Sequence, residues 1–458
     1  MNWLRVYPFL FIALLSCNQA DDPKVQFLNW AQKGTITDNI KCKAEPNQSY
    51  CVYLPTSYDV SKSSPAIYAF DPQGKGRIPV ALMKSIAERL GYIVIGSNNS
   101  KNGLSPEEIN SIVNSLFADT QRKLAIDPNR VYLSGFSGGA RVACMVAQAV
   151  NGIQGVIACS AGFQLDRNSL GFHFIGIAGT QDMNYLEMRR LNAYMDSVGI
   201  QNQLIVFKGK HHWPYEPTIS EAITMLEIYS TQNSIANKSI VDEFLSSNIK
   251  RIHRLKGNNC PDSLALACFI AKRTYETLDG TVDANGLKST IDSLSQMQSF
   301  QKYIKEQVLL EIFEYQKQHE FASAFGSKPE TWWNSEIRKL NDGGVGLKGD
   351  VSIRLLGYIS LRCYGNVNRA FFYKDWKAAQ HFISIYRQVD PENPDSWYAL
   401  ACLQANTDKS IEAIESLKNA IKFGLADFSK IKNDPLLITL RGNPMFNAIL
   451  NGWSEQGV

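Results

Sequence analysis

A serine flanked by glycines is the residue of this chain best placed to act as a nucleophile. Ser137 is the centre of G-F-S-G-G at residues 135–139, between an apolar run at 130–134 and a helical pattern at 140–147. A strand that turns sharply into a helix holds such a serine in a strained conformation, with its hydroxyl exposed. Because a serine hydroxyl is a weak nucleophile at neutral pH, it needs a histidine to take its proton and a carboxylate to orient that histidine.

Candidates for the carboxylate and the histidine follow two later apolar runs. The run at 174–178 leads into Gly-Thr-Gln-Asp, which ends at Asp182, and the run at 204–207 leads into a loop with His211, His212, Trp213 and Pro214. The order serine, acid, histidine differs from that of trypsin-like and subtilisin-like proteases. We therefore predict Asp182 as the acid and either His211 or His212 as the base, because neither Asp71 nor Asp166 follows the strand expected to carry the acid.

Strands and helices alternate over the part of the chain that carries these residues. We predict an α/β fold, with a mostly parallel sheet and helices on both faces, because repeated strand–helix units build such a sheet. The expected strands are 49–54, 66–70, 92–96, 130–134, 155–159, 172–178 and 203–207, and the expected helices are 78–90, 105–124, 140–147 and 185–198.

Residues of about 45–232 resemble the α/β-hydrolase superfamily, nearest its secreted-esterase and polyhydroxybutyrate-depolymerase-like branch. The resemblance is carried by Tyr-Leu-Pro at 53–55, by G-F-S-G-G, by Gly-Thr-Gln-Asp and by G-K-H-H-W-P at 209–214. Members often carry G-x-H-x-W-P there, which assigns the base to His211. The resemblance implies a catalytic triad of Ser137, Asp182 and His211 that hydrolyses carboxylic esters through an acyl-enzyme, without a cofactor.

The resemblance leaves the substrate open. Acyl esters on glycans, polyesters and small esters all fit, and a serine peptidase could use the same triad. The other hypothesis is a binding or assembly lipoprotein whose hydrolase domain is inactive.

The chain departs from the family where an oxyanion donor is expected. The family often has His-Gly after the first long strand, and this chain has Asp71, Pro72, Gln73 and Gly74. Pro72 has no N–H to donate. Alignment with the family therefore assigns the oxyanion hole to the N–H groups of Gln73 and Gly138. We expect Asp71, Phe136, His212 and Trp213 to lie beside the substrate.

The N-terminus has the pattern of a bacterial lipoprotein signal. One arginine precedes an apolar run at 6–15 that is too short to span a bilayer, and the run ends at Leu-Leu-Ser-Cys. We predict residues 1–17 as the signal peptide, Cys17 as the lipidated residue, 18–34 as a linker, and a lipid-anchored location at the outer membrane. The following Asn-Gln-Ala-Asp-Asp is either a surface-export tag or a plain linker.

Composition and cysteine usage narrow the class further. The net charge of +4 is spread over 458 residues without a basic run, so nucleic acid is not an expected partner. The six histidines have no metal-ligand spacing, so no metal is expected. Cys42 and Cys51 flank a segment with turn residues, and export would allow a hairpin disulfide between them.

The second half of the chain has helical patterns and no strand signals. We predict a catalytic domain at 35–232, a polar linker at 233–239, a helical region at 233–350 and a tetratricopeptide-repeat-like domain at 351–458. A long helix is expected at 292–320. The repeat spacing rests on residues such as Trp397, Ala401, Ala413 and Ala420. Ala379 lies one repeat of 34 residues before Ala413, and Pro391 also fits the repeat pattern. Such repeats usually bind peptides or proteins. The alternative is a rigid spacer or a lid on the hydrolase. In either case we expect this half of the chain to shape access to the active site and to contribute no catalytic residue.

Overall fold

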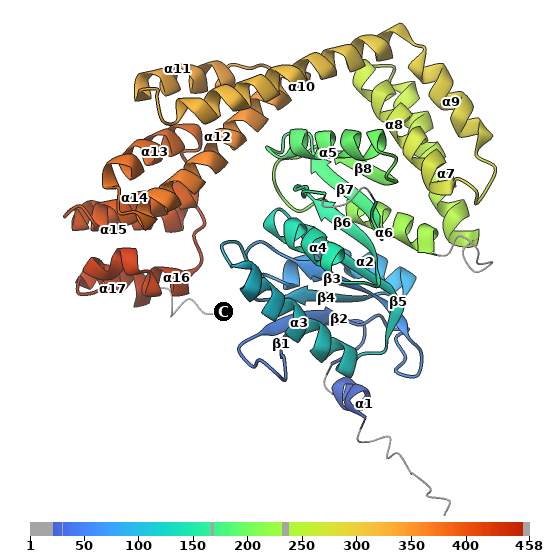
Figure 1. Ribbon diagram of the computed structural model, residues 1–458, viewed down its shortest axis with the longest axis horizontal. Coiled ribbons are helices and arrows are strands. Elements are labelled where there is room, and N and C mark those ends of the chain that lie inside the picture. The colour runs from blue at the N-terminus through green and yellow to red at the C-terminus, as the bar shows by residue number, and fades with distance from the viewer. Residues whose placement is uncertain (1–21, 30, 166–168, 231–237, 452–458) are drawn as a thin grey trace, which may run out of the picture. The chain divides into compact units, whose positions relative to one another are not determined.

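The computed structural model describes residues 22–29, 31–165, 169–230 and 238–451 (Figure 1). The predicted signal peptide with Cys17, most of the linker at 233–239 and the boundary at 232/233 lie outside the described residues. Among the helices described, none is both long and apolar enough to cross a membrane.

Eight strands form one sheet in the order β1-β2-β4-β3-β5-β6-β7-β8 (Figure 1). The first pairs, β1 with β2 and β2 with β4, are antiparallel, whereas β3 is parallel to both β4 and β5, and β5 is parallel to β6. The strands are β1 Ile36–Lys41, β2 Ser49–Tyr53, β3 Ser64–Phe70, β4 Ile93–Ser97, β5 Ile126–Phe136, β6 Ile153–Cys159, β7 His173–Gly179 and β8 Asn202–Phe207. The predicted α/β class with a mostly parallel sheet is confirmed.

Helices alternate with these strands along the chain. They are α1 Pro23–Leu28, α2 Arg77–Leu90, α3 Pro106–Lys123, α4 Gly138–Ala149, α5 Tyr185–Ser197 and α6 Glu216–Ser230. The start of α3 is encoded locally, because the Ser105 side chain accepts from the Glu108 N–H and the Glu108 carboxylate accepts from the Ser105 N–H. The residue patterns did not predict β1, α1 or α6.

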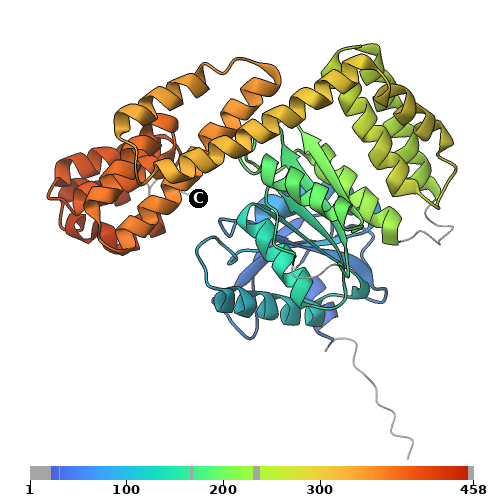
Figure 2. The same ribbon diagram turned by 45° about the horizontal axis from the view of Figure 1, so that its top comes forward.

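From Lys238 onward the described chain is entirely helical. The elements are α7 Lys238–Gly257, α8 Pro261–Leu278, α9 Asn285–Ser295, α10 Gln298–Ala324, α11 Glu330–Asn341, α12 Gly346–Phe372, α13 Trp376–Val389, α14 Pro394–Ala405, α15 Ser410–Lys422, α16 Phe428–Asn433, the 3-10 helix η3 Pro435–Leu440 and α17 Pro444–Asn451. The helices from α12 to α15 pack consecutively on one another (Figures 1 and 2). Ala401, Ala413 and Ala420 are fully buried in an apolar cluster that also includes Ile431 and Phe446. The tetratricopeptide-repeat character of this region stays a prediction.

The predicted long helix at 292–320 is wrong, because the chain breaks between α9 and α10. Met297 has an extended backbone and caps the start of α10. The sequence hides this break: Leu294 and Phe300, on either side of it, pack in the same apolar cluster, so the hydrophobic spacing continues across the turn.

The predicted disulfide between Cys42 and Cys51 is not formed. Cys42 lies across from Gln48, with a 3.0 Å hydrogen bond from its N–H to the Gln48 carbonyl, so Cys51 is three residues farther along β2. Both thiols are buried and free, and burial raises the pKa of Cys42 to about 11 and that of Cys51 to about 12. They are therefore unreactive core residues.

The contacts divide the chain into two compact units. The first comprises the residues up to Cys159, Phe163–Ile175 and Tyr215–Ser230, and the second comprises Ser160–Gly162, Gly176–Pro214 and residues from 231 on. The second unit therefore contains residues of the last two strands as well as the helices after Lys238. The predicted boundaries at 232/233 and 350/351 stay predictions.

Candidate active site

Ser137 lies in a strained turn between β5 and α4. Its φ is +53° and its ψ is −119°, a conformation that non-glycine residues rarely adopt. A side chain at Gly135 would come within 2.2 Å of the Gly139 carbonyl, and one at Gly139 within 1.9 Å of the Phe70 carbonyl. The glycines of the motif are therefore required by close backbone approach, and the turn they permit is held by a 2.8 Å bond from the Ser137 N–H to the Cys159 carbonyl.

His211 and Asp182 form a hydrogen-bonded pair in the second compact unit. The His211 Nδ1 lies 2.9 Å from the Asp182 Oδ1, and Asp182 is fully buried. The Asn184 N–H donates to the same carboxylate oxygen at 2.8 Å, which fixes the orientation of the acid. This is the geometry in which a carboxylate sets the tautomer of a histidine and leaves its Nε2 to accept a proton.

The turns that carry this pair are bound to each other through the backbone. The Thr180 N–H donates to the Phe207 carbonyl at 2.8 Å, and the Gln181 N–H donates to the Gly209 carbonyl at 2.9 Å. A side chain at Gly179 would lie 2.3 Å from the Gly209 carbonyl, so only glycine allows the two turns to approach so closely. We call residues 179–182 the acid turn.

His212 is engaged elsewhere. Its Nδ1 lies 2.5 Å from the carbonyl of Trp213, and its ring packs on Phe207 with centroids 5.5 Å apart. Of the two candidate bases, His211 is therefore the one paired with Asp182.

The N–H of Gln73, the predicted oxyanion donor, is already hydrogen-bonded within its own loop. This N–H donates to the Asp71 Oδ1 at 2.9 Å, and the Gly74 N–H donates to the Asp71 carbonyl at 3.1 Å. Asp71 is buried and orders its own loop in this way, which a sequence alignment does not reveal. The role of Gln73 as an oxyanion donor stays a prediction. Gly138 begins α4, and helix N-termini carry N–H groups without intrahelical partners.

Asn102 was not predicted as a site residue. A side chain at Gly138 would lie 1.8 Å from the Asn102 Oδ1 and 3.5 Å from its Nδ2, so this amide is packed against the residue that follows Ser137. The Asn102 N–H donates to the Pro72 carbonyl at 2.9 Å, which ties its loop to the segment after β3. No motif marks Asn102, because it comes from an irregular loop between β4 and α3.

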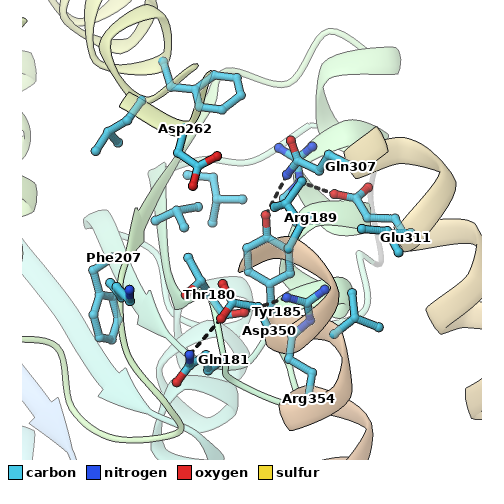
Figure 3. A pocket seen from close by; sticks show the side chains of 18 of the residues that line it. Thr180, Gln181, Tyr185, Arg189, Phe207, Asp262, Gln307, Glu311, Asp350 and Arg354 are labelled. Carbon is cyan, nitrogen blue, oxygen red and sulfur yellow. Dashed lines mark hydrogen bonds and ion pairs between the residues drawn. The ribbon is translucent and has the colours of Figure 1, made fainter. Parts of the chain in front are cut away.

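Side chains of the helical region hold the acid turn from its other side. The Arg354 Nη1 donates to the Thr180 carbonyl at 2.6 Å, and the Gln181 Nε2 donates to the Asp350 Oδ1 at 2.7 Å. The Arg354 guanidinium also binds the fully buried Glu314 through Nε and Nη2. Figure 3 shows Arg354 and Asp350 beside Thr180 and Gln181. No motif in the sequence indicates these contacts, which join residues about 170 positions apart.

The remaining predicted residues lie at the ends of the same elements. Phe136 is buried at the end of β5, and Trp213 is half-buried after β8. The structure thus pairs His211 with Asp182, places Asp71 with Gln73, and presents Ser137 at its turn. A cavity in the second compact unit, described below, is lined by other residues.

The strand order and the strained serine turn define the α/β-hydrolase fold, here followed by a large all-helical region. No protein-family profile matches the sequence, and no curated protein is significantly similar to it.

Solved structures are similar to the part of the chain that contains the sheet. S-formylglutathione hydrolase (FrmB) from Staphylococcus aureus is 13% identical over 43% of this chain and 98% of its own, with a TM-score of 0.36. A ferulic acid esterase is 14% identical over 43% of this chain and 98% of its own, with a TM-score of 0.34. Acylaminoacyl peptidase from Pyrococcus horikoshii is 12% identical over 43% of this chain and 41% of its own, with a TM-score of 0.33.

Proposed function

We propose that this protein is a serine hydrolase that cleaves carboxylic esters through an acyl-enzyme on Ser137. The observation that carries the proposal is the positive φ of Ser137 at a strand–helix turn, in a chain that also holds a hydrogen bond between His211 and the buried Asp182. A strained serine at such a turn is a hallmark of nucleophiles, since strain is retained only where the surrounding structure fixes it.

In the proposed reaction, the Ser137 Oγ attacks the ester carbonyl while His211 Nε2 takes its proton. Asp182 stabilises the resulting imidazolium through Nδ1. The proton then passes to the leaving alcohol, and the acyl group stays on Ser137. A water molecule, deprotonated by His211, attacks the acyl-enzyme and releases the acid.

The oxyanion formed in each step needs donors at the serine turn. The N–H of Gly138 is the first candidate. The Asn102 Nδ2 is the second, because a side-chain amide can supply an oxyanion contact worth about 3 kcal/mol. The amide would have to turn for this, since its acceptor Oδ1 is the atom nearer Gly138 in this structure. The Gln73 N–H would serve only if it exchanged its bond to Asp71 for one to the substrate.

Two alternatives use the same fold. A serine peptidase would cleave amides with the same residues, and a binding lipoprotein would keep the fold without turnover. The strained Ser137 at a strand–helix turn favours an active enzyme, because backbone strain of this kind clusters at active sites. We also propose that Cys17 anchors the protein to the outer membrane and that the helices after 351 bind a protein or peptide.

Labelling with a fluorophosphonate tests the nucleophile. Wild-type protein should be labelled at Ser137, and Ser137→Ala should remain unlabelled. The rate of ester hydrolysis by Ser137→Ala should fall until it exceeds the uncatalysed rate by only roughly 10³-fold. Ser160→Ala is the matched control, because Ser160 also has a positive φ of 60° after a strand but is not followed by a helix. Normal hydrolysis by Ser137→Ala would refute the assignment.

The two histidines make a second test. His211→Ala should abolish labelling of Ser137, because the base is lost. His212→Ala should still be labelled, with its main effect on KM for esters. The reverse result would identify His212, and not His211, as the catalytic base.

The lipid anchor is tested in cells. Cys17→Ala should leave the membrane fraction or remain unprocessed, whereas Cys260→Ala, which removes an exposed thiol, should not. A mature N-terminus at another residue, found by mass spectrometry, would contradict the anchor.

A further inference from the structure

The second compact unit contains a cavity of about 610 Å³ whose wall includes the acid turn (Figure 3). It runs along β8 and is enclosed by α5, α8, α10 and the start of α12. Its volume is within the range of about 300–1,000 Å³ of small-molecule sites. Thr180 and Gln181 line one part of it, so an occupant would lie next to the turn that carries Asp182.

The charges of this wall balance. Five cationic and five anionic side chains line it, and several are already paired with each other. Arg189 binds Glu311 at 3.0 Å, and Lys272 lies 3.6 Å from Glu276. Counted over the whole wall, the positive and negative side chains cancel, so the wall as a whole has no net charge that would attract a phosphate, a carboxylate or an amine.

The neutral part of the wall is rich in groups that both donate and accept hydrogen bonds. Five carboxamide side chains line the cavity, among them Gln203, which binds Glu276, and Gln307, which donates to the Tyr185 hydroxyl at 2.9 Å. A purely apolar occupant would remove water from the polar groups that face the cavity, at a cost of about 1–3 kcal/mol for each group left unpaired.

Apolar surfaces alternate with these polar groups. Phe269 and Tyr303 contribute rings from two helices, and Leu204, Val206 and Leu266 contribute aliphatic contacts. A ligand with C–H faces and hydroxyl edges satisfies both kinds of surface. A lipid chain satisfies only the first, and an ion only the second.

We propose that this cavity binds a neutral oligosaccharide segment, and that the ester cleaved at Ser137 is carried on such a sugar chain. The second clause rests on the proposed function. The first does not, because binding in the cavity requires neither Ser137 nor turnover.

Calorimetric titration of the full chain with cellotetraose, xylotetraose and mannotetraose tests the first clause. At least one should bind, both to the wild type and to Ser137→Ala. Leu266→Trp fills the cavity and should weaken binding by about tenfold or more, equivalent to about 1.4 kcal/mol. Leu309→Trp is the matched control, since Leu309 is exposed on α10 and does not line the cavity.

Asp262→Ala gives a second variant at an exposed wall position, for which folding is not in question. It should also weaken binding. Absence of binding by all three sugars, binding that is unaffected by both wall variants, or preferred binding of a neutral hexapeptide along β8 would each overturn the proposal. If the protein binds a sugar but fluorophosphonates do not label it, the proposed sugar site stands and the proposed hydrolase activity is refuted.

Discussion

At the scale of single residues, the strongest chemical constraint is the backbone around Ser137. Its strain is fixed by Gly135 and Gly139, each of which has a carbonyl oxygen where a β-carbon would lie. Gly139→Ala should therefore disrupt the turn and abolish labelling of Ser137, because the intruding methyl group must displace the backbone of β3. Gly171→Ala, where a β-carbon has open space, is the control. Normal labelling of Gly139→Ala would show that the turn tolerates a side chain.

His173 gives a pH-dependent contribution to stability. It stacks on Tyr229 with ring centroids 4.6 Å apart, and burial lowers its pKa below the ordinary value of 6.5. The unfolded chain therefore binds a proton more readily than the folded chain below about pH 6.5, and stability falls as the pH falls through that value.

His173→Phe should keep the stacking and remove this loss. The difference in Tm between pH 7.5 and pH 5.5 should be smaller in His173→Phe than in the wild type. His253→Gln, at an exposed helical position, should leave the difference unchanged. An unaltered difference in His173→Phe would place the acid sensitivity in other groups.

At the scale of elements, the acid turn depends on α12. Arg354 uses its planar guanidinium to bind Glu314 twice and to reach the Thr180 carbonyl as well. Arg354→Lys keeps the charge that neutralises Glu314, but an ammonium cannot satisfy both partners in this geometry. We expect labelling of Ser137 to slow by roughly tenfold to a hundredfold, as for a misplaced catalytic group.

The control for this variant is Arg338→Lys on the exposed side of α11. The rate of fluorophosphonate labelling and the Tm should be measured together. A lower Tm with an unchanged labelling rate would mean that Arg354 stabilises the fold without positioning the acid.

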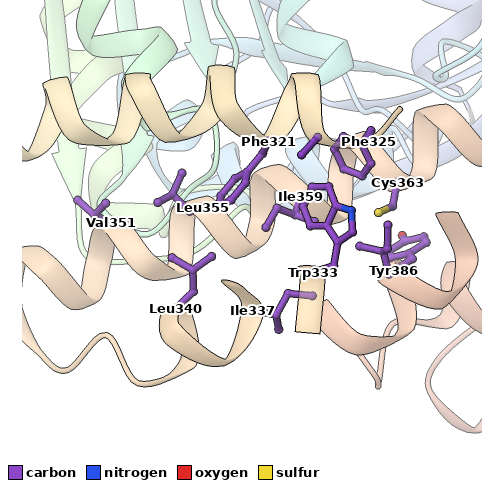
Figure 4. Close-up of a cluster of buried hydrophobic side chains, with 12 residues drawn as sticks. Phe321, Phe325, Trp333, Ile337, Leu340, Val351, Leu355, Ile359, Cys363 and Tyr386 are labelled. Carbon is purple, nitrogen blue, oxygen red and sulfur yellow. The ribbon is translucent and has the colours of Figure 1, made fainter. Parts of the chain in front are cut away.

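Helices α10 to α13 pack on one another through an apolar cluster around Trp333 (Figure 4). Trp333 is fully buried, and its ring lies 4.6 Å from that of Phe325 and 5.7 Å from that of Phe321. Trp333→Ala should lower the free energy of unfolding by about 3–5 kcal/mol. Denaturant unfolding followed by circular dichroism measures this loss. Trp332→Ala is the control, and it should lose less stability because Trp332 is only half-buried. Equal losses in the two variants would contradict the central place of Trp333.

The elements themselves were largely predictable, and their long-range partners were not. Apolar runs and glycine turns gave strands and helices such as β7 and α5 to within a residue or two, because those signals are local. The Asp71–Gln73 bond, the position of Asn102 and the reach of Arg354 depend on loop geometry and on packing between distant segments. A single sequence carries no local signal for such contacts.

At the scale of the whole molecule, the question is whether the hydrolase fold works without its helices. The sequence places Ser137, Asp182 and His211 before residue 233, which predicts that a chain ending at Gln232 would still act on a small ester. The structure changes this expectation, because Arg354 and Asp350 hold the acid turn and the second compact unit joins residues 176–214 to the helices.

A chain ending at Gln232 should therefore lose most labelling of Ser137, even where circular dichroism and gel filtration show a folded monomer. Thr180 and Gln181 would lose their side-chain partners, and the freed turn would no longer fix Asp182 against His211. The control is a chain that ends at Leu425, which lacks α16, η3 and α17 but keeps α10 and α12. Labelling of Ser137 in this control should equal that of the full chain. Full labelling of the shorter chain would show that the acid turn keeps its geometry unaided, and that the helical region serves only substrate or partner binding.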